Sequence, residues 1–169
     1  GIAKKESTPD SYAVATVDFV LETAKRNPNF VYLSAGIVGG INLSPEDRAA
    51  LGSQYVDVGI AEEHAVAMAS GLARGGARPI FGTYSTFFQR VYDQMAQDVA
   101  VNNSPAVFLS VGASMYYMND VTHLGFFDIP LFANIPNLVF LAPASLDEYA
   151  AVLRWSVEQT AHPVMIRMP

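Results

Sequence analysis

Apolar residues recur along this chain with two alternating spacings, and the alternation predicts an α/β fold. Short apolar runs indicate buried strands, while apolar residues three and four positions apart indicate amphipathic helices. Strand-helix alternation favours a mainly parallel sheet covered by helices on both faces, a three-layer sandwich. Strands are expected at residues 30–33, 54–58, 79–83, 106–111, 138–141 and 164–167. Helices are expected from Thr8 or Asp10 to residue 26, after Ser44, and at 61–74, 86–101, 129–133 and 145–159.

Two segments stand out from this alternation. Residues 61–74 are unusually rich in alanine and glycine. Small side chains let backbones approach closely, so we expect this helix to be buried between elements, either against another subunit or as a plain internal core helix. Residues 112–127 have no clear period. A loop of that length inside a compact domain is usually functional or disordered.

Composition and charge narrow the class of protein. The chain has 169 residues, enough for one domain over 1–169. Hydrophobic residues make up 51% and charged residues 15%, so part of the apolar surface is expected to face another domain or subunit, such as the second chain of a homodimer. The net charge of -6 is spread without runs, which argues against nucleic acid and anionic membranes as partners.

Several features bear on compartment and processing. The absence of cysteine excludes disulfides and thiolate metal sites. No stretch approaches a membrane span, and residues 1–5 lack the apolar run of a signal peptide, so a cytoplasmic location is expected. Gly1 in place of methionine suggests a tag remnant or an excised domain.

Candidate chemistry gathers where strands pass into helices. Glu62 lies at such a junction, and open α/β sheets place ligands at the carboxyl ends of their strands. Tyr84 and Phe87 lie at the next junction, and Arg90 follows on the first turn of the helix. Each residue also has an ordinary interpretation: Glu62 could stabilise a helix N-terminus, Phe87 could be core, and Arg90 could form a surface salt bridge. For that salt bridge the candidate partners are Asp93 and Asp57.

These residues belong to a set of motifs that resembles a known family. In order and spacing, the set resembles the pyrimidine-binding domain of the thiamine-diphosphate enzymes related to transketolase, and within them the 1-deoxy-D-xylulose-5-phosphate synthases. The motifs lie at residues 57–64, 84–94, 120–123, 135–137 and 163–167.

The resemblance implies a role for each candidate. Glu62 would hydrogen-bond a ring nitrogen of the cofactor's aminopyrimidine, and the ring of Phe87, with Tyr84 nearby, would stack on it. His123 would line the active site and assist proton transfer to substrate oxygens, while Arg90 would bind a substrate hydroxyl or phosphate. Phe88 is expected in the core. The implied reaction transfers a ketol or acyl unit from a 2-oxo acid or a phosphorylated sugar, with thiamine diphosphate as cofactor.

The chain departs from the family pattern in three places. Where the family usually reads Asp-Gly-Pro before Thr-His, this chain has Asn119, Asp120 and Val121, which leaves open whether Asp120 reaches the substrate. Gly112 takes the position of an arginine that the synthases use for substrate phosphate. The Gly-Asp-Gly motif that holds the diphosphate and its Mg²⁺ on a separate domain is absent from the sequence. The chain alone is therefore expected to be inactive and to need a diphosphate-binding domain or subunit as partner.

Two other interpretations remain open. The scaffold could serve as a non-catalytic dimerisation or regulatory module, and the altered loop would then reflect a loss of catalytic activity. The presence of Glu62 and Phe87 argues against this interpretation. A flavodoxin-like domain for another nucleotide is a weaker alternative, because no strand-to-helix turn carries a glycine-rich phosphate fingerprint.

Overall fold

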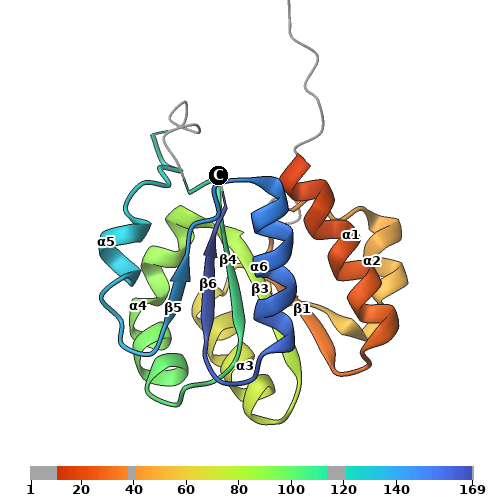
Figure 1. Cartoon of the computed structure of the whole chain (residues 1–169), viewed down its shortest axis with the longest axis horizontal. Coiled ribbons are helices and arrows are strands. Elements are labelled where there is room, and N and C mark those ends of the chain that lie inside the picture. The colour runs from red at the N-terminus through yellow and green to blue at the C-terminus, as the bar shows by residue number, and fades with distance from the viewer. Residues whose placement is uncertain (1–10, 38–40, 114–120, 169) are drawn as a thin grey trace, which may run out of the picture.

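The computed structural model describes residues 11–37, 41–113 and 121–168, and these form a three-layer α/β sandwich around one sheet (Figure 1). Six strands in the order β2-β1-β3-β4-β6-β5 pair in parallel throughout. The strands are β1 (Phe30–Ser34), β2 (Tyr55–Asp57), β3 (Arg78–Tyr84), β4 (Val107–Val111), β5 (Val139–Leu141) and β6 (Val164–Arg167). The predicted fold class is confirmed, and the described sheet is entirely parallel.

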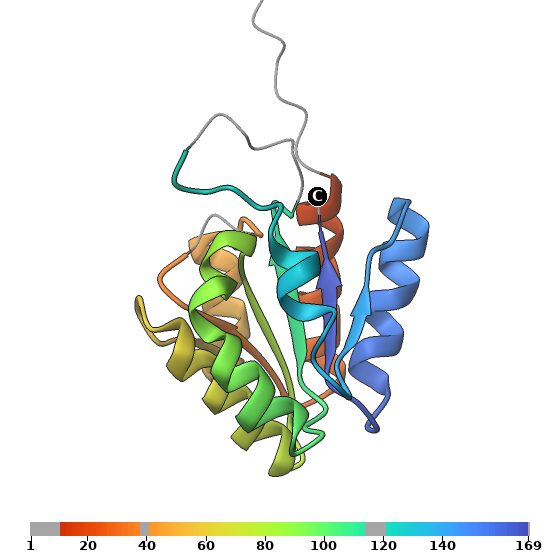
Figure 2. The same ribbon diagram turned by 90° about the vertical axis from the view of Figure 1, so that its left-hand side faces the viewer.

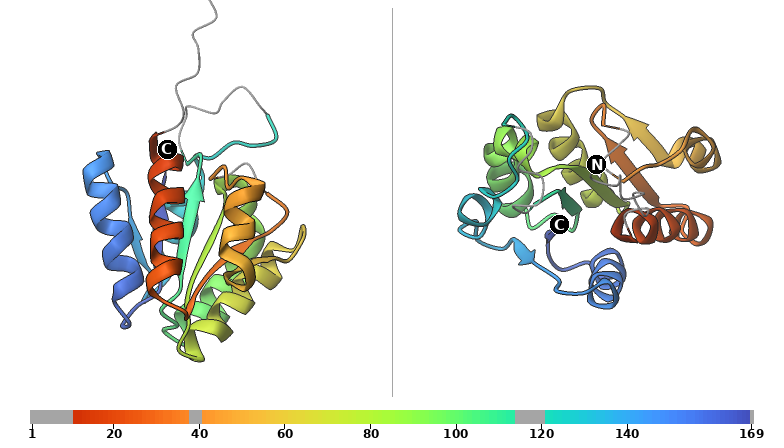
Figure 3. Two further views of the ribbon diagram at one scale, coloured as in Figure 1. Left: turned by 90° about the vertical axis from the view of Figure 1, so that its right-hand side faces the viewer. Right: turned by 90° about the horizontal axis from the view of Figure 1, so that it is seen from above.

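Helices cover both faces of the sheet (Figures 2 and 3). One layer contains α1 (Ser11–Arg26), α2 (Pro45–Leu51) and α6 (Leu146–Glu158), with the short η1 (Gly52–Gln54) following α2. The other layer contains α3 (Glu62–Arg74), α5 (Asp128–Phe132) and a continuous helical stretch made of η2 (Ser85–Val91), α4 (Tyr92–Gln94) and η3 (Met95–Ala100).

Alternating side chains divide the interior into two cores. In β3, Ile80 packs into the core beneath α1 and α6, while the next residue, Phe81, packs into the core beneath α3. The strand register aligns Leu33 with Phe81, Phe81 with Phe108, and Phe108 with Met165, so one apolar row crosses the sheet on the α3 side. Because strand side chains alternate between faces, a single register fixes both cores.

The helix predicted at 86–101 is present, but it is not a regular α-helix. It begins with 3₁₀ geometry in η2, passes through one α-helical turn, and ends with π geometry in η3, where the Val101 amide donates to the carbonyl of Ala96. The buried residues of η2 are Ser85, Phe88 and Val91, each three positions apart. A 3₁₀-helix has three residues per turn, so it aligns all three toward the core.

Two glycines bring the loop after β4 against the end of that strand. Gly112 has φ +66°, a conformation that favours glycine. A Cβ on Gly125 would overlap the carbonyl oxygen of Gly112, so the two backbones touch directly. Gly112 is thus a backbone contact point in this chain.

A buried ion pair fastens the same loop to the last strand. The Nε of Arg167, at the end of β6, donates to Oδ2 of Asp128, the first residue of α5, at 2.7 Å. The Asp128 side chain is fully buried, and its other oxygen accepts no hydrogen bond in the described structure. A buried carboxylate needs a charged partner, so this contact fixes the point where the loop enters α5.

A tyrosine occupies the space above Gly82 in the middle of β3. Tyr32 is buried and stacks on Tyr55 with 6.3 Å between ring centroids. Burial raises the pKa of the Tyr32 phenol far above its usual range, and the nearby Tyr149 and Tyr55 add to the shift. A Cβ on Gly82 would lie 2.5 Å from the Tyr32 hydroxyl oxygen. Glycine at 82 is therefore required by packing.

Replacing Gly82 with alanine should destabilise the domain. The added methyl group must displace a buried, stacked tyrosine, and such overpacking costs about 1–3 kcal/mol of the free energy of unfolding. Gly71→Ala is the matched control, because a Cβ there meets nothing within 4 Å inside α3. That control should stabilise by about 0.5–1 kcal/mol. Urea denaturation measures both changes, and an unaffected Gly82→Ala variant would contradict the packing argument.

Replacing Asp128 with asparagine should also destabilise the domain. The substitution leaves the Arg167 guanidinium, whose side chain is 24% exposed, without its partner, and we expect a loss of about 3 kcal/mol. Asp147→Asn, an exposed acid in the first turn of α6, is the control and should cost less than about 1 kcal/mol. If both variants lost the same free energy of unfolding, the buried ion pair would contribute no more to stability than an exposed acid does.

Candidate functional site

The predicted site residues lie along the carboxyl edge of the sheet. Because all strands are parallel, the junctions after β2 and β3 and the segment after β4 meet at this edge, which is uppermost in Figure 1. Glu62 follows β2, Tyr84 ends β3, and His123 belongs to the segment after β4. Open α/β sheets bind ligands at this edge.

Glu62 is the buried acid of this edge. It is the first residue of α3, and its side chain is only 2% exposed. The turn before it is shaped by Gly59, with φ +72°, whose amide donates to Oδ1 of Asp57 at 2.8 Å. The same Asp57 oxygen accepts from the Gly36 amide at 3.0 Å and so joins the loops that follow β1 and β2. Glu62 is thus presented by a tightly hydrogen-bonded turn.

Arg90 pairs with this buried acid. Its Nη1 lies 3.3 Å from Oε2 of Glu62, and its side chain is 50% exposed. The expectation that Arg90 might pair with Asp93 or Asp57 is wrong: Asp57 is occupied by backbone amides, and Asp93 is exposed on α4. An arginine beside a desolvated carboxylate offsets part of the cost of burying its charge.

The second oxygen of Glu62 remains available. The Arg90 guanidinium donates to Oε2, and no described residue donates a hydrogen bond to Oε1. The carboxylate therefore offers an acceptor at the edge of the sheet. A ring N–H of a planar heterocycle matches such an acceptor.

Three aromatic rings lie beside the ion pair. The Arg90 guanidinium lies over the Phe87 ring, 5.3 Å from its centroid. The His123 ring contacts Phe87 and Tyr84 edge-on, with centroids 5.2 Å and 6.2 Å away. Glu62, Arg90, Phe87, His123 and Tyr84 thus form one continuous chain of contacts.

His123 is oriented by its neighbour in the loop. Its Nδ1 lies 2.7 Å from the Thr122 hydroxyl oxygen. A hydrogen bond at Nδ1 fixes the orientation of the ring and biases its tautomer. The histidine is therefore held in place both by this contact and by the aromatic rings beside it.

Phe87 lies in the candidate site, whereas its neighbour Phe88 lies in the core. Phe88 is fully buried, with its ring 5.6 Å from Phe81 and 6.0 Å from Phe132. The prediction that Phe88 is core is confirmed. Phe87, one position along the 3₁₀ turn, remains partly exposed beside His123.

The described residues leave the predictions for Asp120 and for a metal untested. Asp120 falls outside the described residues, so its proposed contact with substrate stays a prediction. Within residues 11–37, 41–113 and 121–168, no cluster of three or more His, Cys, Asp or Glu side chains could hold a metal ion. None of the helices in those ranges combines the length and the apolar character that crossing a bilayer requires.

Sequence reasoning missed two supports of this site. Neither the Arg167–Asp128 pair nor the contact between Gly112 and Gly125 was expected. Both involve residues far apart in the sequence, and only the glycine of the Thr-His-x-Gly pattern gave a signal. The glycine contact holds the segment that carries His123 against the end of β4. The ion pair holds the same segment where it enters α5.

Comparison with known proteins agrees with this geometry. Residues 11–169 match the family model of the transketolase pyrimidine-binding domain. A 1-deoxy-D-xylulose-5-phosphate synthase from Trichormus variabilis is 37% identical over 168 residues, which are 99% of this chain and 26% of that protein. Another from Synechocystis sp. is 40% identical over 161 residues, 95% of this chain and 25% of that protein. The chain thus spans about a quarter of the length of the curated relatives it matches.

Solved structures agree on the fold. A split-gene transketolase in an inactive beta4 tetramer superposes with a TM-score of 0.75 at 22% identity, covering 93% of this chain and 49% of that one. Transketolase from Leishmania mexicana superposes with a TM-score of 0.78 at 16% identity, covering 92% of this chain and 24% of that one. With a family model matched from the first described helix to the last residue, the chain belongs to the family of transketolase pyrimidine-binding domains.

Proposed function

We propose that this chain supplies the pyrimidine-binding half of a thiamine-diphosphate site in an enzyme that transfers a ketol or acyl unit. The observation that carries the proposal is the buried carboxylate of Glu62, which lies at the carboxyl edge with Arg90 on one oxygen, no described donor on the other, and Phe87 and His123 nearby. The whole enzyme's activity would resemble that of the 1-deoxy-D-xylulose-5-phosphate synthases and transketolases to which the chain is similar.

The residues present fit the pyrimidine ring of that cofactor. Glu62 Oε1 would accept a hydrogen bond from a ring nitrogen, and Phe87 and Tyr84 would contact the face of the heterocycle. Thiamine diphosphate, when bound, supplies the carbon nucleophile that attacks a 2-oxo substrate. The domain's own contribution is to orient the ring and to hold a proton acceptor against it.

Arg90 has two successive roles in this proposal. In the structure it compensates the buried charge of Glu62, and its half-exposed side chain has room to turn away. Once a ring N–H meets the carboxylate, the guanidinium can move toward a substrate hydroxyl or phosphate. His123, held by Thr122, would donate or accept a proton at a substrate oxygen. Asp120 is proposed as a further substrate contact.

The missing half of the site belongs to a partner in this proposal. A diphosphate-binding domain, in another chain or in another part of a longer one, would hold the diphosphate and Mg²⁺. Exposed apolar side chains flank the carboxyl edge, among them Ile60, which is 81% exposed two residues before Glu62, and Val121, which is 86% exposed two residues before His123. Such surfaces suit coverage by another domain or by a second subunit of a homodimer. The split-gene transketolase offers a precedent for an enzyme of this class divided between chains.

Cofactor binding should depend on the partner domain and on Glu62. Thiamine diphosphate with Mg²⁺ is titrated calorimetrically into the chain alone and into its mixture with a diphosphate-binding domain from the same source. We expect tight binding only in the mixture. Glu62→Gln should weaken that binding about tenfold or more, because a hydrogen bond to a charged group contributes roughly 1.5–3 kcal/mol.

Glu63→Gln provides the matched control for this titration. Glu63 is the exposed neighbour of Glu62 in the same helix turn, so its substitution changes the charge equally and should leave the affinity unchanged. Equal weakening by both variants would remove the specific role of Glu62. Absence of any binding in the mixture would refute the composite site and favour a non-catalytic module on the same scaffold.

His123 should matter for turnover more than for cofactor affinity. In the mixture, His123→Asn should lower kcat by about 10²–10⁴-fold, the range typical for loss of a general acid or base. Calorimetry on the same variant should show nearly unchanged cofactor affinity. A large loss of cofactor affinity with kcat preserved would make His123 a structural part of the cofactor pocket.

A further inference from the structure

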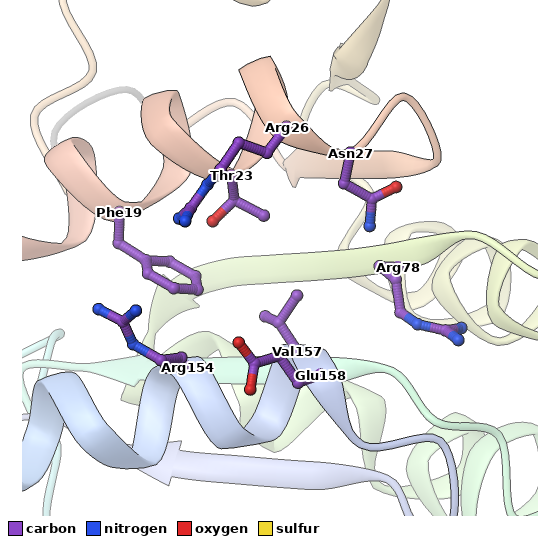
Figure 4. A pocket seen from close by; sticks show the side chains of 8 residues that line it. All are labelled: Phe19, Thr23, Arg26, Asn27, Arg78, Arg154, Val157 and Glu158. Carbon is purple, nitrogen blue, oxygen red and sulfur yellow. The ribbon is translucent and has the colours of Figure 1, made fainter.

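A hollow lined by both charged and apolar side chains lies on the opposite side of the domain from the candidate site. It has a volume of about 340 Å³ and opens between the C-terminal ends of α1 and α6 (Figure 4). This size falls near the lower end of the range of small-molecule sites, roughly 300–1,000 Å³. Its walls carry Phe19, Thr23, Arg26, Asn27, Arg78, Arg154, Val157 and Glu158.

Strand β3 separates this hollow from the candidate site. Arg78 begins β3 and Tyr84 ends it. Six residue steps of about 3.3 Å place them roughly 20 Å apart along the strand. The hollow therefore lies at the amino edge of the sheet, where no side chain can reach the residues around Glu62.

Positive charge is concentrated in this hollow. Arg26, Arg78 and Arg154 line it together with one acid, Glu158, a formal charge of +2, which becomes +1 when Glu22, the ion-pair partner of Arg26, is counted. The guanidinium groups of Arg26 and Arg154 lie on either side of Phe19, whereas that of Arg78 is directed away from them (Figure 4). In a chain with a net charge of -6, two guanidinium groups beside one small depression favour an anion there.

Much of the hydrogen-bonding capacity of these arginines is unused. Arg26 pairs with Glu22 at 3.3 Å on the exposed surface of α1, and Arg78 donates to the carbonyl of Ala77 at 3.1 Å. Arg154 forms no ion pair or hydrogen bond with any described residue. Each guanidinium has five N–H donors, so most of the N–H groups here have no acceptor among the described residues.

An apolar wall accompanies the charge. The ring of Phe19 lies between the guanidinium groups of Arg26 and Arg154, and Val157 lies beside them (Figure 4). Phe19 and Val157 also belong to the core under α1 and α6, so this wall is fixed by packing. A ligand that fits must join a compact anion to a small apolar group.

We propose that this hollow binds a small organic phosphate monoester at a site distinct from the candidate thiamine site. A phosphate monoester carries about -1.5 to -2 charges at pH 7, and the guanidinium groups of Arg26 and Arg154 beside Phe19 are its cationic partners. Its oxygens accept paired hydrogen bonds from guanidinium groups, and its organic part lies on Phe19. The site depends only on residues of α1, β3 and α6 and does not rest on the proposed cofactor function.

Phenyl phosphate is a suitable probe, and inorganic phosphate tests the contribution of the ring. Each is titrated into the full chain and followed by residue-resolved NMR in the Arg90→Gln background, which removes the arginine expected to bind phosphate at the carboxyl edge. We expect saturable shifts at the ends of α1 and α6 and at the start of β3. Phenyl phosphate should bind more tightly than inorganic phosphate.

Charge variants make the expected result specific. Arg154→Gln should weaken phenyl phosphate binding about tenfold or more, and Glu158→Gln should tighten it severalfold by removing the one negative group. Lys25→Gln is the matched control, because Lys25 is exposed beside Arg26 on α1 but does not line the hollow. It should leave the affinity nearly unchanged.

Three outcomes would overturn the proposal. They are the absence of saturable shifts at the amino edge, equal weakening by Lys25→Gln and Arg154→Gln, and weaker binding in Glu158→Gln. None of these results bears on Glu62 or on cofactor affinity, so this site and the proposed function succeed or fail separately. If inorganic phosphate bound as tightly as phenyl phosphate, the site would take the bare anion, and its assignment to organic phosphates would be wrong.

Discussion

The parallel pairing of all six described strands constrains everything else in this domain, because it sends every strand-to-helix junction to one edge of the sheet. Glu62, Tyr84 and Phe87 are separated by up to 25 positions in the sequence, yet they gather there because β2 and β3 end there. The same direction of the strands places helix C-termini and strand starts at the opposite edge, where Arg26 and Arg154 flank the ring of Phe19. The candidate site and this hollow thus lie at opposite edges because of one rule of chain direction.

The two buried carboxylates at the carboxyl edge of the sheet, Asp128 and Glu62, differ in how fully an arginine compensates their charge. Asp128 is fully buried and meets an arginine that is itself mostly covered, so the pair behaves as a structural fastening. Glu62 is equally buried, but its arginine is half exposed and engages only one oxygen. The second pair thus engages only one carboxylate oxygen, as expected of an acid whose further partner comes from outside the domain.

The sequence allowed much of this architecture to be predicted, because strand runs and helical spacing are local signals. The boundaries of β3 and α3 agree with the prediction within one residue at each end. The 3₁₀ and π geometry of 85–100 was missed, although Ser85, Phe88 and Val91 already recur every three residues. The partner of Arg90 was also missed, since it depends on the distance between α3 and η2, which no local pattern encodes. Glu62, Phe87 and His123 were identified through motif resemblance, because a buried acid cannot be told from an exposed one by its neighbours alone.

The contact between Gly112 and Gly125 sets how freely the loop after β4 can change. At this point the loop meets the strand through backbone atoms, while the ring of His123, two residues before Gly125, is positioned by Thr122 and by the rings of Phe87 and Tyr84. An arginine introduced at position 112 would meet both a positive φ and the abutting backbone of Gly125, so the strand end and the loop would have to change together. A guanidinium at this point of the edge is therefore out of reach of a single substitution that leaves the loop in place.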